Sequence, residues 1–335
     1  MTIDYQILGK PGRDNALLVR IDSGQSISRL LFDCGDRCLD ELSISEVQSI
    51  DALFFSHFHM DHVGGFDSFF RCTFGRDTQR NDVYGPADTT SILHHRFQGF
   101  WWNLCSDLKS TWRVHDVTSD KINAAEFLAC DGFQARKDCE PVSHDGTIIT
   151  HADYTVQTIE LDHNGPSLAY RVNEANRTNV DTDRMKELGL KPGPWLRQLK
   201  DGESGTINVG DQSLDLDELR SKLLTTSKGD SIAYLTDFLL DEAAHERLVP
   251  WLRGCNTVVC EAQYRHADSE LATRNYHTTT KNVGQLAAAA EVGELKLFHL
   301  SDRYSNEEWL EMLAECRSEF ANTSFADEWQ LPSYE

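Results

Sequence analysis

Three histidines and one aspartate lie close together in the string SHFHMDH at residues 56–62. They are His57, His59, Asp61 and His62, and their spacing is H-x-H-x-D-H. Imidazole nitrogens and carboxylate oxygens together suit Zn²⁺ or a similar divalent ion. The chain has 13 histidines, and with that number such a string arises by chance on the order of one time in a thousand. We therefore favour a metal site over a surface loop of solvated histidines.

One loop cannot fill a site for two metals, so further donors are expected on other elements. The string itself follows an apolar run at residues 52–55, which is typical of a buried strand. Three other donors also follow apolar runs of strand length: His163, Asp237 and His299. Any one of them alone is as readily a structural residue with a satisfied hydrogen bond. Together, at equivalent positions after separate strands, they support one metal centre at a common sheet edge.

The apolar pattern of the chain indicates strands in two groups, with helices after each group. Helical spacing is clearest at residues 239–252, 280–290 and 306–320. An α/β (α+β) sandwich of sheets covered by helices accommodates this order of elements. We expect one domain over residues 1–335.

Two stretches depart from this pattern. Residues 174–230 form a polar segment that is too long for an ordinary connection, and it contains a Pro-Gly-Pro turn. We interpret its first part, at about 177–205, as a projecting arm. Residues 97–112 are rich in phenylalanine and tryptophan. A hydrophobic cover or a dimer contact is the favoured interpretation, and stacking on unpaired bases is the alternative.

Composition limits the class of protein. The chain has 335 residues, 40% of them hydrophobic, and a formal net charge of -22. A surface this acidic does not attract nucleic acid or anionic lipid as a whole, so any polyanion must bind locally. The N-terminal residues lack the features of a signal peptide, and no apolar run reaches the roughly 18–20 residues that span a bilayer. We therefore expect a cytoplasmic protein without membrane segments, whose nine cysteines are reduced.

The order of the candidate ligands resembles that of the metallo-β-lactamase superfamily, and within it the chain is similar to ribonuclease Z. The resemblance rests on segments spread over most of the chain: LFDCGD at 31–36, SHFHMDHVGGF at 56–66, VYGP at 83–86, DHNGPSLAYRV at 162–172, KELGLKPGPWLRQLKDGE at 186–203, IAYLTDF at 232–238, CEAQY at 260–264, YHTTTKNVGQLA at 276–287 and FHLSDRY at 298–304. The histidine string is shared by the whole superfamily, whereas the Pro-Gly-Pro arm and the last two segments are specific to ribonuclease Z. The implied fold is a four-layered αβ/βα sandwich.

The resemblance also implies a ligand set for two zinc ions per subunit. His57, His59 and His163 would hold one ion, and Asp61, His62 and His299 the other. Asp237 would bridge the two ions. Two metals clamp the attacking and leaving oxygens of a phosphodiester displacement. The same donors also accept manganese or iron.

Catalytic roles follow from the same resemblance. Asp61 would orient or deprotonate the attacking water, and Glu261 with His277 would protonate the leaving 3′ oxygen. A carboxylate beside an imidazole raises the fraction of imidazolium, which is the proton-donating form. The alternative for His277 is a capping residue at the start of the helix from residue 280.

A basic cluster lies within the expected arm. Residues 184–200 carry five basic side chains against the single acidic Glu187: Arg184, Lys186, Lys191, Arg197 and Lys200. In ribonuclease Z the arm binds the tRNA elbow and serves the partner subunit, which implies a homodimer here. It also implies substrate contacts by the turn of Pro192, Gly193 and Pro194, and by Arg303. A solvated charged helix followed by a turn is the alternative.

The resemblance thus predicts a metal-dependent endonuclease that cuts precursor tRNA at its 3′ side. The alternative is a small-molecule phosphodiesterase, or another hydrolase of the same fold that does not act on tRNA. A scaffold without activity that only binds RNA or a partner is a third hypothesis, and it is the weakest because all seven expected ligands are present.

Overall fold

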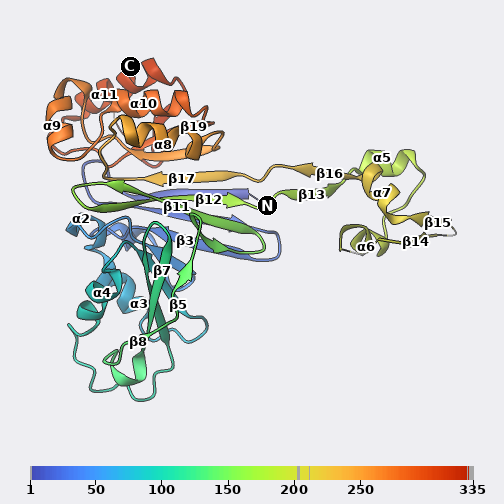
Figure 1. Cartoon of the computed structure of the whole chain (residues 1–335), viewed down its shortest axis with the longest axis horizontal. Coiled ribbons are helices and arrows are strands. Elements are labelled where there is room, and N and C mark those ends of the chain that lie inside the picture. The colour runs from blue at the N-terminus through green and yellow to red at the C-terminus, as the bar shows by residue number, and fades with distance from the viewer. Residues whose placement is uncertain (1, 202–203, 211, 330, 332–335) are drawn as a thin grey trace.

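Two mixed β-sheets lie face to face, and helices cover the outer face of each (Figure 1). This computed structural model describes residues 2–201, 204–210, 212–329 and 331. The order helices, sheet, sheet, helices is the four-layered sandwich that the sequence predicts. Within the described residues, no helix has both the length and the apolar character needed to cross a membrane.

The first sheet has the strand order β1-β2-β3-β4-β5-β6-β7-β8, with β9 also paired to β7. Its strands are β1 (Thr2–Gly9), β2 (Asn15–Asp22), β3 (Ile27–Phe32), β4 (Ala52–Phe54), β5 (Asn81–Gly85), β6 (Thr111–Val117), β7 (Lys121–Leu128), β8 (Lys137–Asp138) and β9 (Val142–Ser143). Its helices are η1 (Cys38–Glu41), α1 (Ile44–Gln48), α2 (Met60–Val63), α3 (Phe66–Thr73), α4 (Thr89–Phe97) and η2 (Ala129–Asp131). The strands from β3 to β6 run parallel to one another.

The second sheet has the order β10-β11-β12-β17-β18-β19-β20. Its strands are β10 (Thr147–Thr150), β11 (Tyr154–Asp162), β12 (Pro166–Glu174), β17 (Ser231–Leu235), β18 (Thr257–Glu261), β19 (Glu294–Phe298) and β20 (Thr323–Phe325). Its helices are α8 (Glu242–Leu252), η3 (His266–Asp268), α9 (Ser269–Arg274), α10 (Thr280–Ala289) and α11 (Asn306–Glu319). The strands β17 to β20 are parallel, so their carboxyl ends meet at one edge.

The main core lies between the two sheets. Aromatic rings from both sheets meet there, with Phe32 stacked on Phe54 at 4.8 Å between centroids and Tyr170 edge-on to Phe54 at 5.3 Å. The strands β17 and β18 are buried at every position because one face meets the other sheet and the other face meets α8 and α10. This core holds the strand ends that carry the candidate ligands in fixed positions.

The arm is a chain excursion that leaves the second sheet after β12 and returns at β17 (Figure 1, right). Its base is a two-stranded ribbon of β13 (Arg177–Val180) and β16 (Leu224–Ser227). Its end contains α5 (Thr182–Glu187), α6 (Trp195–Asp201), β14 (Thr206–Val209), β15 (Gln212–Asp215) and α7 (Leu216–Leu223). The expected range of about 177–205 therefore covers only the outgoing half of this excursion.

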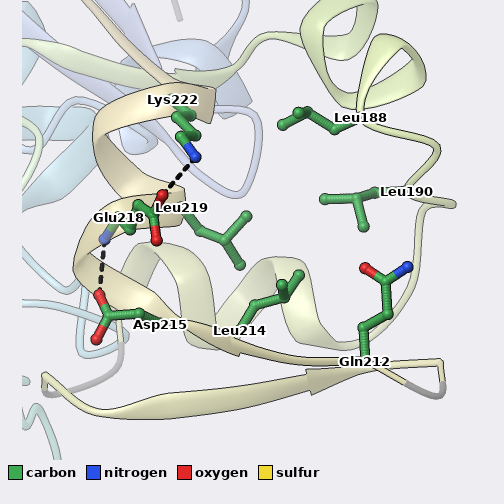
Figure 2. A pocket seen from close by; sticks show the side chains of 8 residues that line it. All are labelled: Leu188, Leu190, Gln212, Leu214, Asp215, Glu218, Leu219 and Lys222. Carbon is green, nitrogen blue, oxygen red and sulfur yellow. Dashed lines mark hydrogen bonds and ion pairs between the residues drawn. The ribbon is translucent and has the colours of Figure 1, made fainter.

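The end of the arm has a small apolar core of its own. Met185, Trp195, Leu199, Leu219 and Leu223 are all buried there, apart from the main core. Figure 2 shows four leucine side chains that face a hollow of about 150 Å³ beside this core: Leu188, Leu190, Leu214 and Leu219. An Asp215 side chain that accepts from the Glu218 amide starts α7 (Figure 2). The end of the arm is therefore packed around its own apolar side chains, apart from the core between the sheets.

The aromatic segment at 97–112 is buried at its two ends and largely exposed between them. Phe97 and Trp112 are fully buried and contact each other and Phe70. Trp102 is half-buried against Phe133, whereas Trp101 is 88% exposed. The ends of this segment therefore cover α3 and the sheet, as the favoured interpretation expects, whereas Phe100 and Trp101 are exposed between them.

Candidate metal centre

All seven expected ligands lie at one end of the sandwich, where strands of both sheets stop. His57 and His59 follow β4, and Asp61 and His62 lie in α2. The second sheet contributes three residues, each directly or nearly after its strand: His163 after β11, Asp237 after β17 and His299 after β19. The structure brings these seven side chains together in two overlapping groups.

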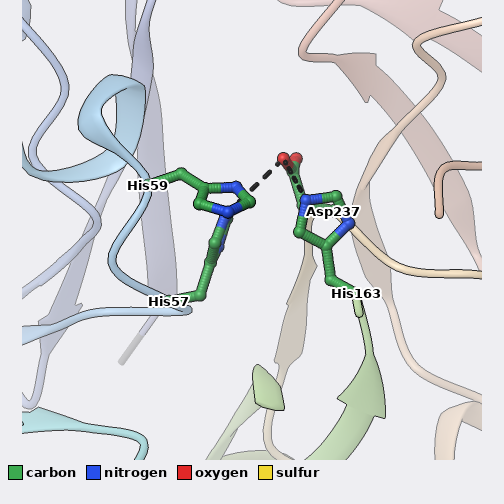
Figure 3. A group of neighbouring side chains, drawn as sticks. All are labelled: His57, His59, His163 and Asp237. Carbon is green, nitrogen blue, oxygen red and sulfur yellow. Dashed lines mark ion pairs between the residues drawn. The ribbon is translucent and has the colours of Figure 1, made fainter. Parts of the chain in front are cut away.

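The first group contains His57, His59, His163 and Asp237 (Figure 3). The Nε2 atoms of His57 and His163 lie 3.7 Å and 3.6 Å from the Asp237 Oδ2 atom. The His163 ring is oriented by its other nitrogen, which lies 2.7 Å from the backbone oxygen of Tyr276. That contact fixes the tautomer and directs Nε2 towards Asp237.

The second group contains Asp61, His62, Asp237 and His299. His62 Nε2 lies 3.3 Å from Asp237 Oδ2 and 3.4 Å from Asp61 Oδ2. His299 lies between the two carboxylates, with Nε2 3.3 Å from Asp61 and Nδ1 3.3 Å from Asp237. Asp237 is therefore shared by both groups, which is the position expected of a bridging ligand.

Asp33 supports the centre from behind and was not predicted as a site residue. Its buried carboxylate accepts hydrogen bonds from the Ser56 amide and hydroxyl at 2.7 Å and from the Tyr234 hydroxyl at 2.9 Å. The same carboxylate lies 2.8 Å from His62 Nδ1. It thus fixes both the start of the histidine string and the orientation of His62. In the sequence, its signals are an acidic residue at the end of an apolar run and its place in the LFDCGD segment at 31–36.

The donor chemistry fits divalent cations. The Nε2 atoms of His57 and His62 are buried and, among the described residues, have no hydrogen-bond partner. Buried polar atoms of this kind are costly unless something else satisfies them. Both atoms point at carboxylates in a set of imidazole and carboxylate donors, which is a typical environment for zinc. The residues present therefore fit a metal centre.

Protonation states favour the same interpretation. Burial lowers the pKa of His57, so its ring is neutral and can bind a metal through a lone pair. Burial also disfavours the charged form of His62, but Asp237 and Asp33 outweigh it and raise its pKa. A cation that binds His62 must therefore displace a proton.

Glu261 and His277 form a pair beside the second group. Glu261 is fully buried at the end of β18, and its Oε1 atom accepts from the Phe238 amide at 2.9 Å. His277 Nδ1 lies 3.1 Å from Glu261 Oε2. Burial lowers the pKa of His277, but the Glu261 carboxylate outweighs it and raises the pKa to about 9. The imidazolium form therefore predominates near neutral pH.

The capping alternative for His277 is wrong. The N-cap of α10 is Thr279, whose side chain accepts from the Asn282 amide. His277 instead lines a cavity of about 400 Å³ that opens at the metal centre. The cavity lining also includes Asp61, His163 and Asp237, together with five residues that were given no role in the sequence analysis: Asn164, Gln263, Arg274, Asn275 and Tyr276.

The expected substrate-binding residues of the arm do not join this cavity. Arg184, Lys186, Lys191, Arg197 and Lys200 are exposed on α5, α6 and the turn between them, as are Pro192 and Pro194, while Gly193 is half-buried. Figure 1 places α5 and α6 at the far end of the ribbon. Over residues 177–227 the chain has eight basic and nine acidic side chains, so the basic character belongs to residues 184–200 and not to the whole arm.

Arg303 lies nearer to the centre. Its guanidinium carbon lies 5.0 Å from the centroid of the Tyr264 ring, a cation–π contact. The Tyr264 ring in turn lies 5.8 Å from that of His277. Arg303 is therefore on the surface, and the Tyr264 ring separates it from His277.

Known proteins resemble this chain over nearly its whole length. It is 45% identical to the ribonuclease Z of Deinococcus radiodurans, covering 96% of this chain and 97% of the relative. It is 28% identical to the ribonuclease Z of Acaryochloris marina, covering 95% and 92%. The family described as "Anti-Pycsar protein Apyc1" matches residues 13–164.

Solved structures show the fold. The metallo-beta-lactamase fold protein YhfI of Bacillus subtilis matches with a TM-score of 0.58 at 14% identity, over 97% of this chain and 95% of that one. The short form of human tRNase Z matches with a TM-score of 0.53 at 15% identity, over 100% of both chains. The chain therefore has the metallo-β-lactamase fold.

We predict that Asp33→Asn weakens metal binding about 10- to 100-fold, because an amide cannot accept all the hydrogen bonds that orient the His62 ring and the Ser56 backbone. Affinity is measured by competition with a chromophoric chelator. Asp51→Asn is the matched control, since Asp51 also accepts a backbone hydrogen bond, from Arg29 at 2.7 Å, outside the centre. An Asp33→Asn protein with unchanged metal affinity would contradict this role.

Proposed function

This chain belongs to the ribonuclease Z family, and on that premise we propose that it is a metal-dependent endonuclease that cuts precursor tRNA at its 3′ side and leaves a 3′ hydroxyl. The observation that carries the proposal is the pair of donor groups that share Asp237 beside the Glu261–His277 pair. A centre for two cations and a separate proton donor are the two parts that hydrolysis of a phosphodiester needs.

We propose two Zn²⁺ ions per subunit, held as the family pattern implies. His57, His59 and His163 would hold one ion, Asp61, His62 and His299 the other, and Asp237 both. The geometry supports this allocation because each group is compact and Asp237 belongs to both. When bound, the two ions supply Lewis-acid stabilisation of the phosphodiester and lower the pKa of water.

Asp61 is the proposed residue that orients the attacking water. Its carboxylate lines the cavity and is 44% exposed, in contrast to the buried Asp237. Burial raises the pKa of Asp61, but His299 and His62 more than offset this, so the group stays ionised. An ionised carboxylate at the cavity surface can accept a proton from water.

The proton that the leaving 3′ oxygen needs would come from His277. Glu261 cannot reach the cavity itself, because it is fully buried and its Oε1 atom accepts from the Phe238 amide. It therefore acts on His277, whose imidazolium form it stabilises. His277 lines the same cavity as Asp61, so the donor and the water-orienting group face one substrate.

The exposed basic side chains of residues 184–200 are the proposed contact for tRNA outside the cavity. Lys186 pairs with Asp183, but the described residues include no ion-pair partner for Arg184, Lys191, Arg197 or Lys200. In an acidic protein these charges offer a local site for a polyanion. We also propose that the protein is a homodimer, that it acts in the cytoplasm, and that the arm of one subunit serves the cavity of the other. Arg303 is proposed to contact the substrate as well.

The first test is cleavage of a 3′-extended precursor tRNA alongside bis(p-nitrophenyl) phosphate, at low salt. We expect cutting at the base of the acceptor stem, its loss after chelation, and its return on addition of Zn²⁺. Parallel additions of Mn²⁺ and Fe²⁺ test the choice of metal. Turnover of the small diester with intact tRNA would instead favour the small-molecule phosphodiesterase.

The arm is tested by the double variant Lys191→Ala/Lys200→Ala. If both side chains contact phosphates, binding of precursor tRNA weakens, and the slope of log affinity against log salt falls by roughly 0.7–0.9 for each contact. Lys121→Ala/Lys228→Ala removes the same charge from the body of the protein and is the control. If the slope of log affinity against log salt were equal for the two double variants, the basic side chains of residues 184–200 would be excluded as a tRNA site.

His277→Ala should lower kcat for precursor tRNA by about 10²- to 10⁴-fold, since it removes the proposed proton donor. Metal content, measured by mass spectrometry, should stay at the wild-type level because His277 is not one of the proposed ligands. Glu261→Gln should reduce kcat as well. A His277→Ala protein that has lost metal would identify His277 as a ligand, because Asp237, Glu261, His277 and His299 also lie within ligand distance of one another.

A further inference from the structure

The residue before His277 has an unusual backbone conformation. Tyr276 lies in the connection between α9 and α10 with φ of 57°, in the left-handed region. Glycine takes this conformation without cost, and asparagine and aspartate tolerate it, but a bulky side chain rarely adopts it. A strained backbone angle of this kind is retained at a functional site when the residue has a role there that offsets the cost of the strain.

The backbone alone does not explain a tyrosine at this position. The Tyr276 carbonyl oxygen lies 2.7 Å from His163 Nδ1 and orients that ring. A glycine would present the same oxygen and would adopt the same φ without strain. We therefore look for the role of Tyr276 in its side chain.

The tyrosine side chain is available for a ligand. Tyr276 is half-buried and lines the 400 Å³ cavity together with Asp61 and His277. Among the described residues, its hydroxyl has no hydrogen-bond partner and its ring contacts no other aromatic ring. The nearby Tyr264 differs in both respects, because its hydroxyl accepts from Asn275 and its ring packs under Arg303.

A guanidinium lies two residues away on the same wall. Arg274, the last residue of α9, is exposed and lines the same cavity. In the part of the chain that the structure describes, Arg274 has neither a hydrogen bond nor an ion pair from its side chain. An unpaired arginine is notable in a chain with 54 acidic and 32 basic residues. A guanidinium of this kind matches the geometry of a phosphate.

We propose that Arg274 and Tyr276 form a nucleotide subsite at the mouth of the metal centre. Tyr276 stacks on the base of an unpaired nucleotide in the 3′ extension, and Arg274 binds its phosphate. This inference rests on the proposed function, since it assigns the position of the 3′ extension beside the scissile bond. Unpaired nucleotides fit such a subsite because their bases are free to stack on aromatic side chains.

The test begins with Tyr276→Gly, a change that suits the backbone conformation at this position. We expect KM for precursor tRNA to rise roughly 5- to 100-fold, as for loss of one stacked base. The loss on bis(p-nitrophenyl) phosphate should be several-fold smaller. Tyr276→Trp should restore stacking and KM. Metal content reports whether His163 keeps its orientation.

Glu291→Gly is the matched control. Glu291 also has a left-handed φ of 54°, and it is exposed on the surface after α10. Its contact with Arg253 at 3.0 Å is an exposed ion pair of little energetic value. This variant should cleave both substrates as the wild type does.

The decisive measurement pairs the variant with an altered substrate. Precursor tRNAs carry an abasic residue at the first or the second position of the 3′ extension. If Tyr276 stacks on one of these bases, removal of that base raises KM for the wild type but not for Tyr276→Gly. Arg274→Ala should lower the salt slope of binding, and Arg274→Lys should restore part of it.

Two failures are distinguishable. If each abasic residue changed KM equally in the wild type and in Tyr276→Gly, while the wild type cleaved the unmodified precursor normally, the subsite would be overturned. The proposed function would then still stand. No cleavage of precursor tRNA by the metal-loaded wild type would overturn the proposed function, and the subsite with it.

Discussion

The buried carboxylate of Asp237 contacts histidines that follow strands of both sheets. Asp237 is 2% exposed, and imidazoles of four histidines lie within 3.3–3.7 Å of it. A buried charge is costly unless opposite charges and hydrogen bonds compensate it. Two of these imidazoles come from the first sheet and two from the second, so the compensation requires both sheets in one relative position. The aromatic side chains between the sheets therefore have to pack in that same relative position of the two sheets.

Much of the centre was predictable because few side chains bind metals and because strand ends converge. The string at residues 56–62 identified the first four donors, and His163, Asp237 and His299 were found because each follows an apolar run. The same runs predicted the layers of the fold. These inferences depend only on residue type and local pattern, which a sequence contains in full.

The residues that escaped prediction act through tertiary contacts or backbone angles. Asp33 lies in the LFDCGD segment, but its role depends on contacts with residues such as Tyr234, which is 201 positions away. Tyr276 begins a segment that resembles ribonuclease Z, but only its φ angle and the cavity that it shares with Arg274 suggest a role for its side chain. The returning half of the arm was also missed, because β14, β15 and α7 are short and lie in a polar segment.

The arm is an insertion between neighbouring strands. β12 and β17 pair with each other in the second sheet, with Asn173 opposite Ser231, so the whole arm occupies the place of a hairpin loop. A loop at this point can lengthen, shorten or be exchanged while the sheet keeps its register. Because the arm has its own core, a change of its length or sequence would leave the strand ends that carry the seven donors where they are.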